Sequence, residues 1–230
     1  MTGITIHAIN ESLTNWPFQF TALPAGRTAD MPEAWQPIAA AKTPPQRIAA
    51  ALTLWPHDIR DLLPRFSTEF AARLEDVVVG QDDDGVHVLL YPARDKSGRL
   101  VTWVGYDPRT VDDDFPDWVD FPEPLARFLH QVHAGFVAET PASFGPTRPA
   151  YMENLNEALG VPEGIDGWDA DIPPTRLLRI SNDGGTLHHC LSPDLPLGTI
   201  AITSYELDTE PLWPALDALM TSGFDGNQWR

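Results

Sequence analysis

The residues with the clearest chemical potential are three consecutive side chains, His188, His189 and Cys190. A cysteine beside a histidine can act as a nucleophile with its base, and both residue types bind zinc. They belong to TLHHCL (186–191), which has the composition of a strand. In a strand, His189 points away from both of its neighbours. Since no second cysteine or suitably spaced histidine completes a zinc set, we expect a buried thiol beside strand-face histidines.

A second pair of histidines, His130 and His133, has the i, i+3 spacing that places two side chains near each other on a helix. The HxxH pattern alone is a weak metal signal, because no glutamate accompanies it in the arrangement of a zinc protease. Both residues fall beside an apolar stripe. We therefore expect them at the edge of a helix.

The acidic runs 82–84 and 112–114 are the remaining candidates for cation binding. If Gly85 were the sixth position of a calcium loop, the twelfth would be Tyr91 and not the required glutamate. We expect solvated acidic loops, which can equally form a contact surface for a basic partner. The sequence predicts no metal site, no cofactor and no set of catalytic residues.

Composition limits the classes of partner. The chain has 230 residues, with 33 Asp and Glu against 15 Lys and Arg, so its formal net charge is -18. Such a charge repels nucleic-acid phosphates and anionic membranes and favours a basic protein, although it can also serve solubility alone. The single cysteine excludes an internal disulfide, and no secretory signal or membrane-spanning run is visible. We expect a cytoplasmic protein that binds neither nucleic acid nor membrane.

The N-terminal half predicts short elements. ITIHA (4–8) has strand composition, and residues 31–74 predict a succession of short helices interrupted by prolines. Residues 77–79 begin a change to strands, with two clear runs at 86–91 and 99–106. These predict a hairpin or meander.

The C-terminal half starts with the clearest helix, at 122–134, where an apolar residue recurs at i, i+3, i+4 and i+7. A short helix is expected at 151–159, and the last helix begins near Pro211. Three strands are expected between them, and Asn182-Asp183-Gly184-Gly185 is a strong hairpin turn. The strands are predicted at 177–181, 186–191 and 199–207.

The segment LLRISNDGGTLHHCLSPDLPLGTIAITSYE (177–206) resembles the paired-strand signature of SUKH-superfamily immunity proteins. PEPLARFLHQVHAGF (122–136) is similar to the early helix of that family, and PLWPALDALM (211–220) to its closing helix. The resemblance implies an α+β fold with a mixed or antiparallel sheet flanked by short helices. It covers residues 116–230 and leaves 1–115 as an N-terminal helical region plus a hairpin, which is either a separate domain or an elaboration of the same one.

The resemblance also implies a function. SUKH proteins are non-catalytic, cytoplasmic antitoxin-like proteins of polymorphic toxin systems, and each binds a cognate toxin. We expect this chain to occlude a toxin with a basic active-site cleft. Tryptophans in acidic loops suit such an interface, although they can equally cap a core. The expected partner-binding residues are Asp82, Asp83, Asp84, Asp112, Asp113, Asp114, Asp117, Trp118 and Trp168.

Two alternatives stay open. One is a small metal- or thiol-dependent hydrolase that uses His188, Cys190 and acidic loop residues. The other is a regulatory adaptor with no toxin partner. Metal content and thiol reactivity would separate the hydrolase from a binding protein, and the neighbouring genes would separate the adaptor from an immunity protein.

Overall fold

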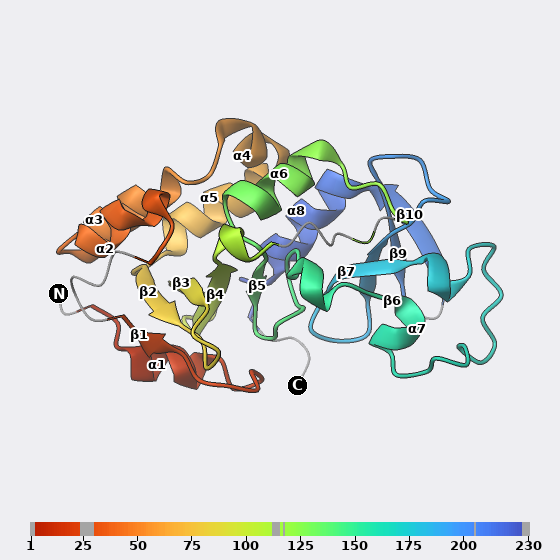
Figure 1. Ribbon diagram of the computed structural model, residues 1–230, viewed down its shortest axis with the longest axis horizontal. Coiled ribbons are helices and arrows are strands. Elements are labelled where there is room, and N and C mark those ends of the chain that lie inside the picture. The colour runs from red at the N-terminus through yellow and green to blue at the C-terminus, as the bar shows by residue number, and fades with distance from the viewer. Residues whose placement is uncertain (1–2, 24–29, 112–115, 117, 205, 227–230) are drawn as a thin grey trace.

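The protein is an α+β structure built on two five-stranded antiparallel sheets (Figure 1). The computed structural model describes residues 3–23, 30–111, 116, 118–204 and 206–226. In the first sheet the strands lie in the order β1 (Thr21–Ala22), β2 (Val78–Gln81), β3 (His87–Arg94), β4 (Leu100–Tyr106) and β5 (Phe136–Ala138). In the second sheet the order is β10 (Leu207–Pro211), β9 (Thr199–Thr203), β8 (His188–Leu191), β7 (Leu178–Asn182) and β6 (Glu153–Asn154).

The first sheet is covered by helices on both faces. Side chains of β3 and β4 alternate between two hydrophobic clusters, since Leu89 and Trp103 face one and Val88 and Val104 face the other. Helix α1 covers the second face, and helices α2 to α5 cover the first (Figure 1). Strands β3 and β4 are therefore buried on both sides, which explains their nearly continuous apolar runs in the sequence. The predicted hairpin at 86–106 is confirmed.

The helices are short and several begin at a proline, as predicted. Their bounds are α1 (Ile6–Ser12), α2 (Gln36–Ala40), α3 (Pro44–Leu52), α4 (His57–Leu62), α5 (Pro64–Arg73), α6 (Glu123–Gln131), α7 (Leu155–Ala158) and α8 (Leu212–Ser222). Single 3₁₀ turns lie at Glu33–Trp35, Pro108–Thr110, Pro149–Tyr151 and Pro174–Arg176. Pro44 and Pro64 each occupy the first helical position, where the missing N–H costs no hydrogen bond. No helix among the described residues is both long and apolar enough to cross a membrane.

The prediction of a strand at 4–8 is wrong. Residues Ile6–Ser12 form helix α1, and the Thr5 side chain caps it by accepting a hydrogen bond from the backbone N–H of Ala8, at 3.2 Å. The alternating apolar pattern that suggested a strand also fits a short helix, because Ile9 and Leu13 repeat at i, i+4 and are buried against the first sheet.

The second sheet is a meander closed by α8. Strands β7, β8 and β9 lie within or beside the predicted segments, and the hairpin turn at 182–185 joins β7 to β8. Strand β10 was not predicted; its sequence LDTEP is polar and ends in proline, which suits an edge strand. The helix predicted at 151–159 is reduced to α7, whose first turn carries a capping box formed by Asn154 and Glu157.

A short irregular segment, residues 139–148, joins the two sheets; we call it the seam. On one side, the N–H of Phe136 in β5 donates to the Pro146 carbonyl, at 2.8 Å. On the other side, the N–H groups of Phe144 and Thr147 donate to β7, to the carbonyls of Asn182 (2.8 Å) and Ile180 (2.9 Å). The backbone hydrogen bonding is thus continuous from the first sheet to the second.

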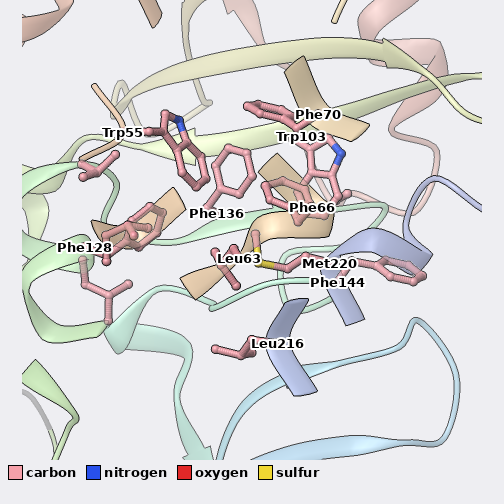
Figure 2. Close-up of a cluster of buried hydrophobic side chains, with 14 of the residues drawn as sticks. Trp55, Leu63, Phe66, Phe70, Trp103, Phe128, Phe136, Phe144, Leu216 and Met220 are labelled. Atoms are coloured by element: carbon pink, nitrogen blue, oxygen red, sulfur yellow. The ribbon is translucent and has the colours of Figure 1, made fainter. Parts of the chain in front are cut away.

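One hydrophobic core contains buried residues of both sheets and of the helices packed against them (Figure 2). Aromatic rings from α5, β4 and β5 stack at its centre, with the planes of Trp103 and Phe136 at 12° and their centroids 5.1 Å apart. Phe144 of the seam and Met220 of α8 lie at one end of the same cluster (Figure 2). The boundary expected at 115/116 falls between β4 and β5, which are neighbours in one sheet.

Helix α6 confirms the predicted apolar stripe but ends earlier than expected. Leu125, Phe128 and Leu129 are buried, and the helix stops at Gln131. The expectation that His133 lies at a helix edge is wrong, because this side chain follows the helix and is 0% exposed. The Tyr91 hydroxyl hydrogen-bonds to its Nε2 at 2.9 Å. Burial lowers the pKa of His133 to about 3, so the ring is neutral at physiological pH.

Candidate functional site

The candidate site is a pocket beside the seam, between the first sheet, the second sheet and α8. Its volume is about 420 Å³, within the range of sites that bind small ligands or side chains. We call it the seam pocket. Helix α8 forms one wall, and the residues on which its chemistry depends are Arg99, Glu139, Phe144, Asp183, His189 and Glu210.

The rim on the side of the first sheet is a rigid ion-pair chain. Asp95, which is 2% exposed, accepts hydrogen bonds from the backbone N–H groups of Ser97 and Arg99, both at 2.9 Å. The Arg99 guanidinium donates to Asp95 at 3.0 Å and to Glu139 at 2.9 Å. Burial opposes ionisation of Asp95, but these donors together hold its pKa below the ordinary value. The chain fixes Glu139 at the start of the seam.

Two residues of the seam have a left-handed backbone although neither is glycine. Glu139 has a φ of 62° and Phe144 a φ of 64°, and no other described non-glycine residue has a positive φ. Such conformations are uncommon, and for a bulky residue like phenylalanine they are strained. Hydrogen bonds hold the conformation at Phe144: its N–H donates to the Asn182 carbonyl, and the Ser143 hydroxyl donates to the Asn182 side chain at 2.7 Å. Both strained residues line the seam pocket.

His189 contributes a buried ring to the pocket. It lies in β8 directly opposite Ile202 of β9, on the sheet face that packs toward α8. The side chain is 5% exposed, and neither ring nitrogen forms a hydrogen bond with the described part of the chain. Burial lowers the pKa of His189 to about 4, so the ring is neutral at pH 7 and presents one donor and one acceptor nitrogen.

The charge around the pocket is predominantly negative. Four carboxylates line it, those of Glu139, Asp183, Glu210 and Asp225, against the single guanidinium of Arg99. Glu139 pairs with Arg99, and Asp225 pairs with a lysine. Asp183 and Glu210 form no ion pair within the described residues. The site can therefore accept an additional positive group.

No protein-family model matches this chain, and no curated protein or solved structure matches it.

The acidic turn between β2 and β3 contains three of the predicted partner-binding residues. Asp82 is 8% exposed, and one of its oxygens accepts from the N–H groups of Asp84 (3.1 Å) and Val86 (2.8 Å). Burial raises the pKa of Asp82 above its ordinary value. Asp83 and Asp84 are exposed and available to a partner.

The other predicted partner-binding residues do not gather around this turn. Asp112, Asp113, Asp114 and Asp117 lie outside the described residues. Trp118 is 36% exposed. Trp168 is half-buried in the loop after α7, where its indole N–H donates to the Ile172 carbonyl at 3.0 Å. That loop and the β2–β3 turn belong to different sheets and lie well apart (Figure 1).

The cluster at 188–190 is split between the two faces of the second sheet, as predicted. Cys190 is 0% exposed in a small apolar cluster with Leu155, Leu177 and Ala201. Burial raises the pKa of its thiol to about 12, which leaves no thiolate at neutral pH. Among the described residues, no three His, Cys, Asp or Glu side chains are grouped so that they could hold a metal ion.

Sequence reasoning missed most of the seam pocket. Asp183 was recognised only as a turn residue and His189 only as a strand-face histidine. Arg99, Glu139 and Glu210 gave no signal, because they lie in three separate segments that only the folded chain brings together. A positive φ at Phe144 is also invisible in a sequence, where glycine is the usual indication of that conformation.

Proposed function

We propose that this chain is a non-enzymatic immunity-type protein that binds a basic protein, a cognate bacterial toxin in the cytoplasm, and covers its active-site cleft. The observation that carries the proposal is the pair of carboxylates without basic partners, Asp183 and Glu210, at a pocket of a chain with net charge -18. Carboxylates that have no basic partner in their own chain can bind a cation supplied by another molecule.

The chemistry at Cys190 supports binding over thiol catalysis. A nucleophilic cysteine needs a lowered pKa and access to solvent, whereas this thiol is buried and its pKa is raised. His189, the neighbouring base, projects from the opposite face of the strand. The two groups therefore cannot act together on one substrate.

The order of elements in the C-terminal half also supports the proposal. Strand β7, an Asp-Gly-Gly turn, strand β8, strand β9 and helix α8 follow one another as the resemblance to SUKH proteins implies, with β10 inserted before the helix. Long-range attraction between the acidic chain and a basic cleft would accelerate association, and salt would slow it.

The test is co-expression with the product of the immediately upstream gene. We expect that product to arrest growth alone, and this chain to restore growth and to co-purify with it. Surface plasmon resonance should then show an association rate that falls steeply as ionic strength rises.

Replacing Asp112, Asp113 and Asp114 by serine should reduce both the association rate and its salt dependence. The matched control is replacement of three exposed threonines or serines by alanine, which changes no charge. A neighbour that is neither toxic nor bound would contradict the immunity function. Zinc or nickel in the purified protein by elemental analysis would favour the metal-dependent hydrolase instead.

A further inference from the structure

We propose that the seam pocket receives an arginine side chain of the protein partner. The inference rests on the proposed function, since it assigns to that function the place where the partner is held. The proposed ligand is a guanidinium group carried by a polypeptide.

Electrostatics selects a cation. Asp183 uses one oxygen, Oδ1, to accept from the N–H groups of Gly185 (2.8 Å) and Leu187 (3.1 Å), and no described residue forms a hydrogen bond or ion pair with its second oxygen. Glu210 is exposed on β10, and its side-chain carboxylate has no hydrogen-bond partner among the described residues. Both line the seam pocket, so an entering guanidinium would find two free acceptors.

The walls suit the rest of an arginine side chain. Phe144 borders the pocket but is 6% exposed, so a guanidinium would stack only on the part of its ring that faces the pocket. Leu187, which is 39% exposed, and the half-buried Ile202 offer apolar surface to an aliphatic stem. A lysine would lack both the planar stacking and the paired donors, which is why we infer arginine.

His189 is an independent sign of a missing ligand. A polar side chain that is 5% exposed normally forms a hydrogen bond, yet neither of its ring nitrogens has a partner among the described residues. Arginine carries only donors, and a neutral imidazole offers one acceptor nitrogen. Since Nδ1 is closed to solvent, Nε2 is the nitrogen that a guanidinium in the pocket would reach and donate to.

Arg99 shows that the local geometry already suits this group. Its guanidinium is held by two carboxylates, at 3.0 Å from Asp95 and 2.9 Å from Glu139. An incoming arginine would use the free carboxylates across the pocket, Asp183 and Glu210, and need not displace Arg99. The ion-pair chain would then act as a fixed rim.

The test is a titration of the full-length, ¹⁵N-labelled protein with N-acetylarginine amide, followed by NMR. We expect saturable shifts of the backbone amides of Leu187, His189, Ile202 and Leu219, which line the pocket. N-acetylcitrulline amide, a neutral compound of nearly the same shape, should cause none, and N-acetyllysine amide should bind more weakly. Equal shifts with citrulline, or shifts confined to other surfaces, would overturn the inference.

Two matched pairs of variants test whether arginine binding depends on the carboxylates of the seam pocket. Asp183→Asn retains the oxygen that accepts in the turn, so it removes charge without removing the turn contacts, and Glu210→Gln is its counterpart on β10. Each should weaken arginine binding about two- to fivefold. Asp166→Asn and Glu163→Gln remove the same charges from the exposed loop after α7 and should leave binding unchanged. Equal weakening by both pairs would reduce the effect to net charge and contradict a defined pocket.

The inference and the proposed function can fail separately. The titration requires no partner, so it tests the pocket even if the upstream product is neither toxic nor bound. Conversely, if the pocket variants still rescue growth and bind the toxin with unchanged affinity, while Asp83→Asn and Asp84→Asn do not, the pocket is not the binding site. That result would support the immunity function and show that the seam pocket is not the arginine-binding site.

Discussion

Asp217 of α8 caps the N-terminus of α5 by accepting a hydrogen bond from the backbone N–H of Phe66, at 2.8 Å. The two residues are 151 positions apart. The residue that precedes α5, Leu63, has no side chain able to cap it. Asp217 is 4% exposed, and it also accepts from the Arg65 guanidinium at 3.1 Å. One carboxylate thus ties the C-terminal helix to the N-terminal helices.

Asp217→Ala should lower the free energy of unfolding by about 2–3 kcal/mol, because it removes a helix cap and leaves a buried N–H without an acceptor. Asp217→Asn retains one acceptor oxygen and should cost about half as much. Urea unfolding followed by tryptophan fluorescence measures both values. Asp169→Ala, at an exposed loop carboxylate with no ion pair among the described residues, should stay within about 0.5 kcal/mol. A cost that small for Asp217→Ala would show that the cap is dispensable.

Sequence patterns correctly predicted those helices, strands and turns that are specified by residues close together in the sequence. The stripe at Leu125, Phe128 and Leu129 identified α6, and Asn182-Asp183-Gly184-Gly185 identified the β7–β8 turn. Helix α1 was misread because a short apolar alternation fits either structure, and only the Thr5 cap distinguishes them. Strand β10 gave no signal, because pairing with β9 and not its own composition makes it a strand.

The candidate site was less predictable because it depends on contacts between distant segments. Arg99 precedes β4, Glu139 follows β5, and Glu210 lies near the C-terminus. No spacing rule connects them. The left-handed backbone at Phe144 is likewise held by a hydrogen bond to Asn182 of β7, a contact that cannot be read from the local sequence. Charge and composition indicated a basic partner without locating its place of binding.

The buried histidines should make the fold sensitive to acid. Burial lowers the pKa of His133 to about 3, below its ordinary value of 6.5, so between these pH values the unfolded chain binds a proton that the folded chain does not. The free energy of unfolding must then fall as pH falls, by about 1.4 kcal/mol per pH unit and about 2 kcal/mol from pH 7 to pH 5. Urea unfolding at each pH measures this slope.

His133→Gln should reduce the difference between pH 7 and pH 5 by about 2 kcal/mol, whatever its effect on stability at pH 7. His189, whose pKa is about 4, should contribute a similar slope that His189→Gln removes. The control is His57→Gln, since this side chain is exposed on α4. An unchanged slope in both buried variants would mean that those histidines have the same pKa in the folded and unfolded protein.

Cys190 should be unreactive in the native protein. Its thiol is 0% exposed and its pKa is raised to about 12, so neither access nor thiolate is provided at pH 7. We expect Ellman's reagent to modify less than about a tenth of the protein over minutes in buffer and all of it in denaturing urea. Rapid stoichiometric labelling of the folded chain would contradict this burial and make the thiol-dependent hydrolase worth testing.

At Glu139 we expect glycine to give a more stable protein than alanine, which is the reverse of the usual order. Both Glu139→Ala and Glu139→Gly lose the ion pair with Arg99. The difference between their free energies of unfolding therefore reports the effect of the backbone conformation alone. Glycine normally costs about 0.5–1 kcal/mol relative to alanine, but at a φ of 62° it is the residue without strain. We therefore expect Glu139→Gly to be more stable than Glu139→Ala by about 1 kcal/mol in urea unfolding. The same pair of substitutions at Glu163, exposed in the loop after α7, provides the reference. If alanine were the more stable at Glu139, the seam would not be held in the left-handed conformation, and the pocket that it borders would have a different shape in solution.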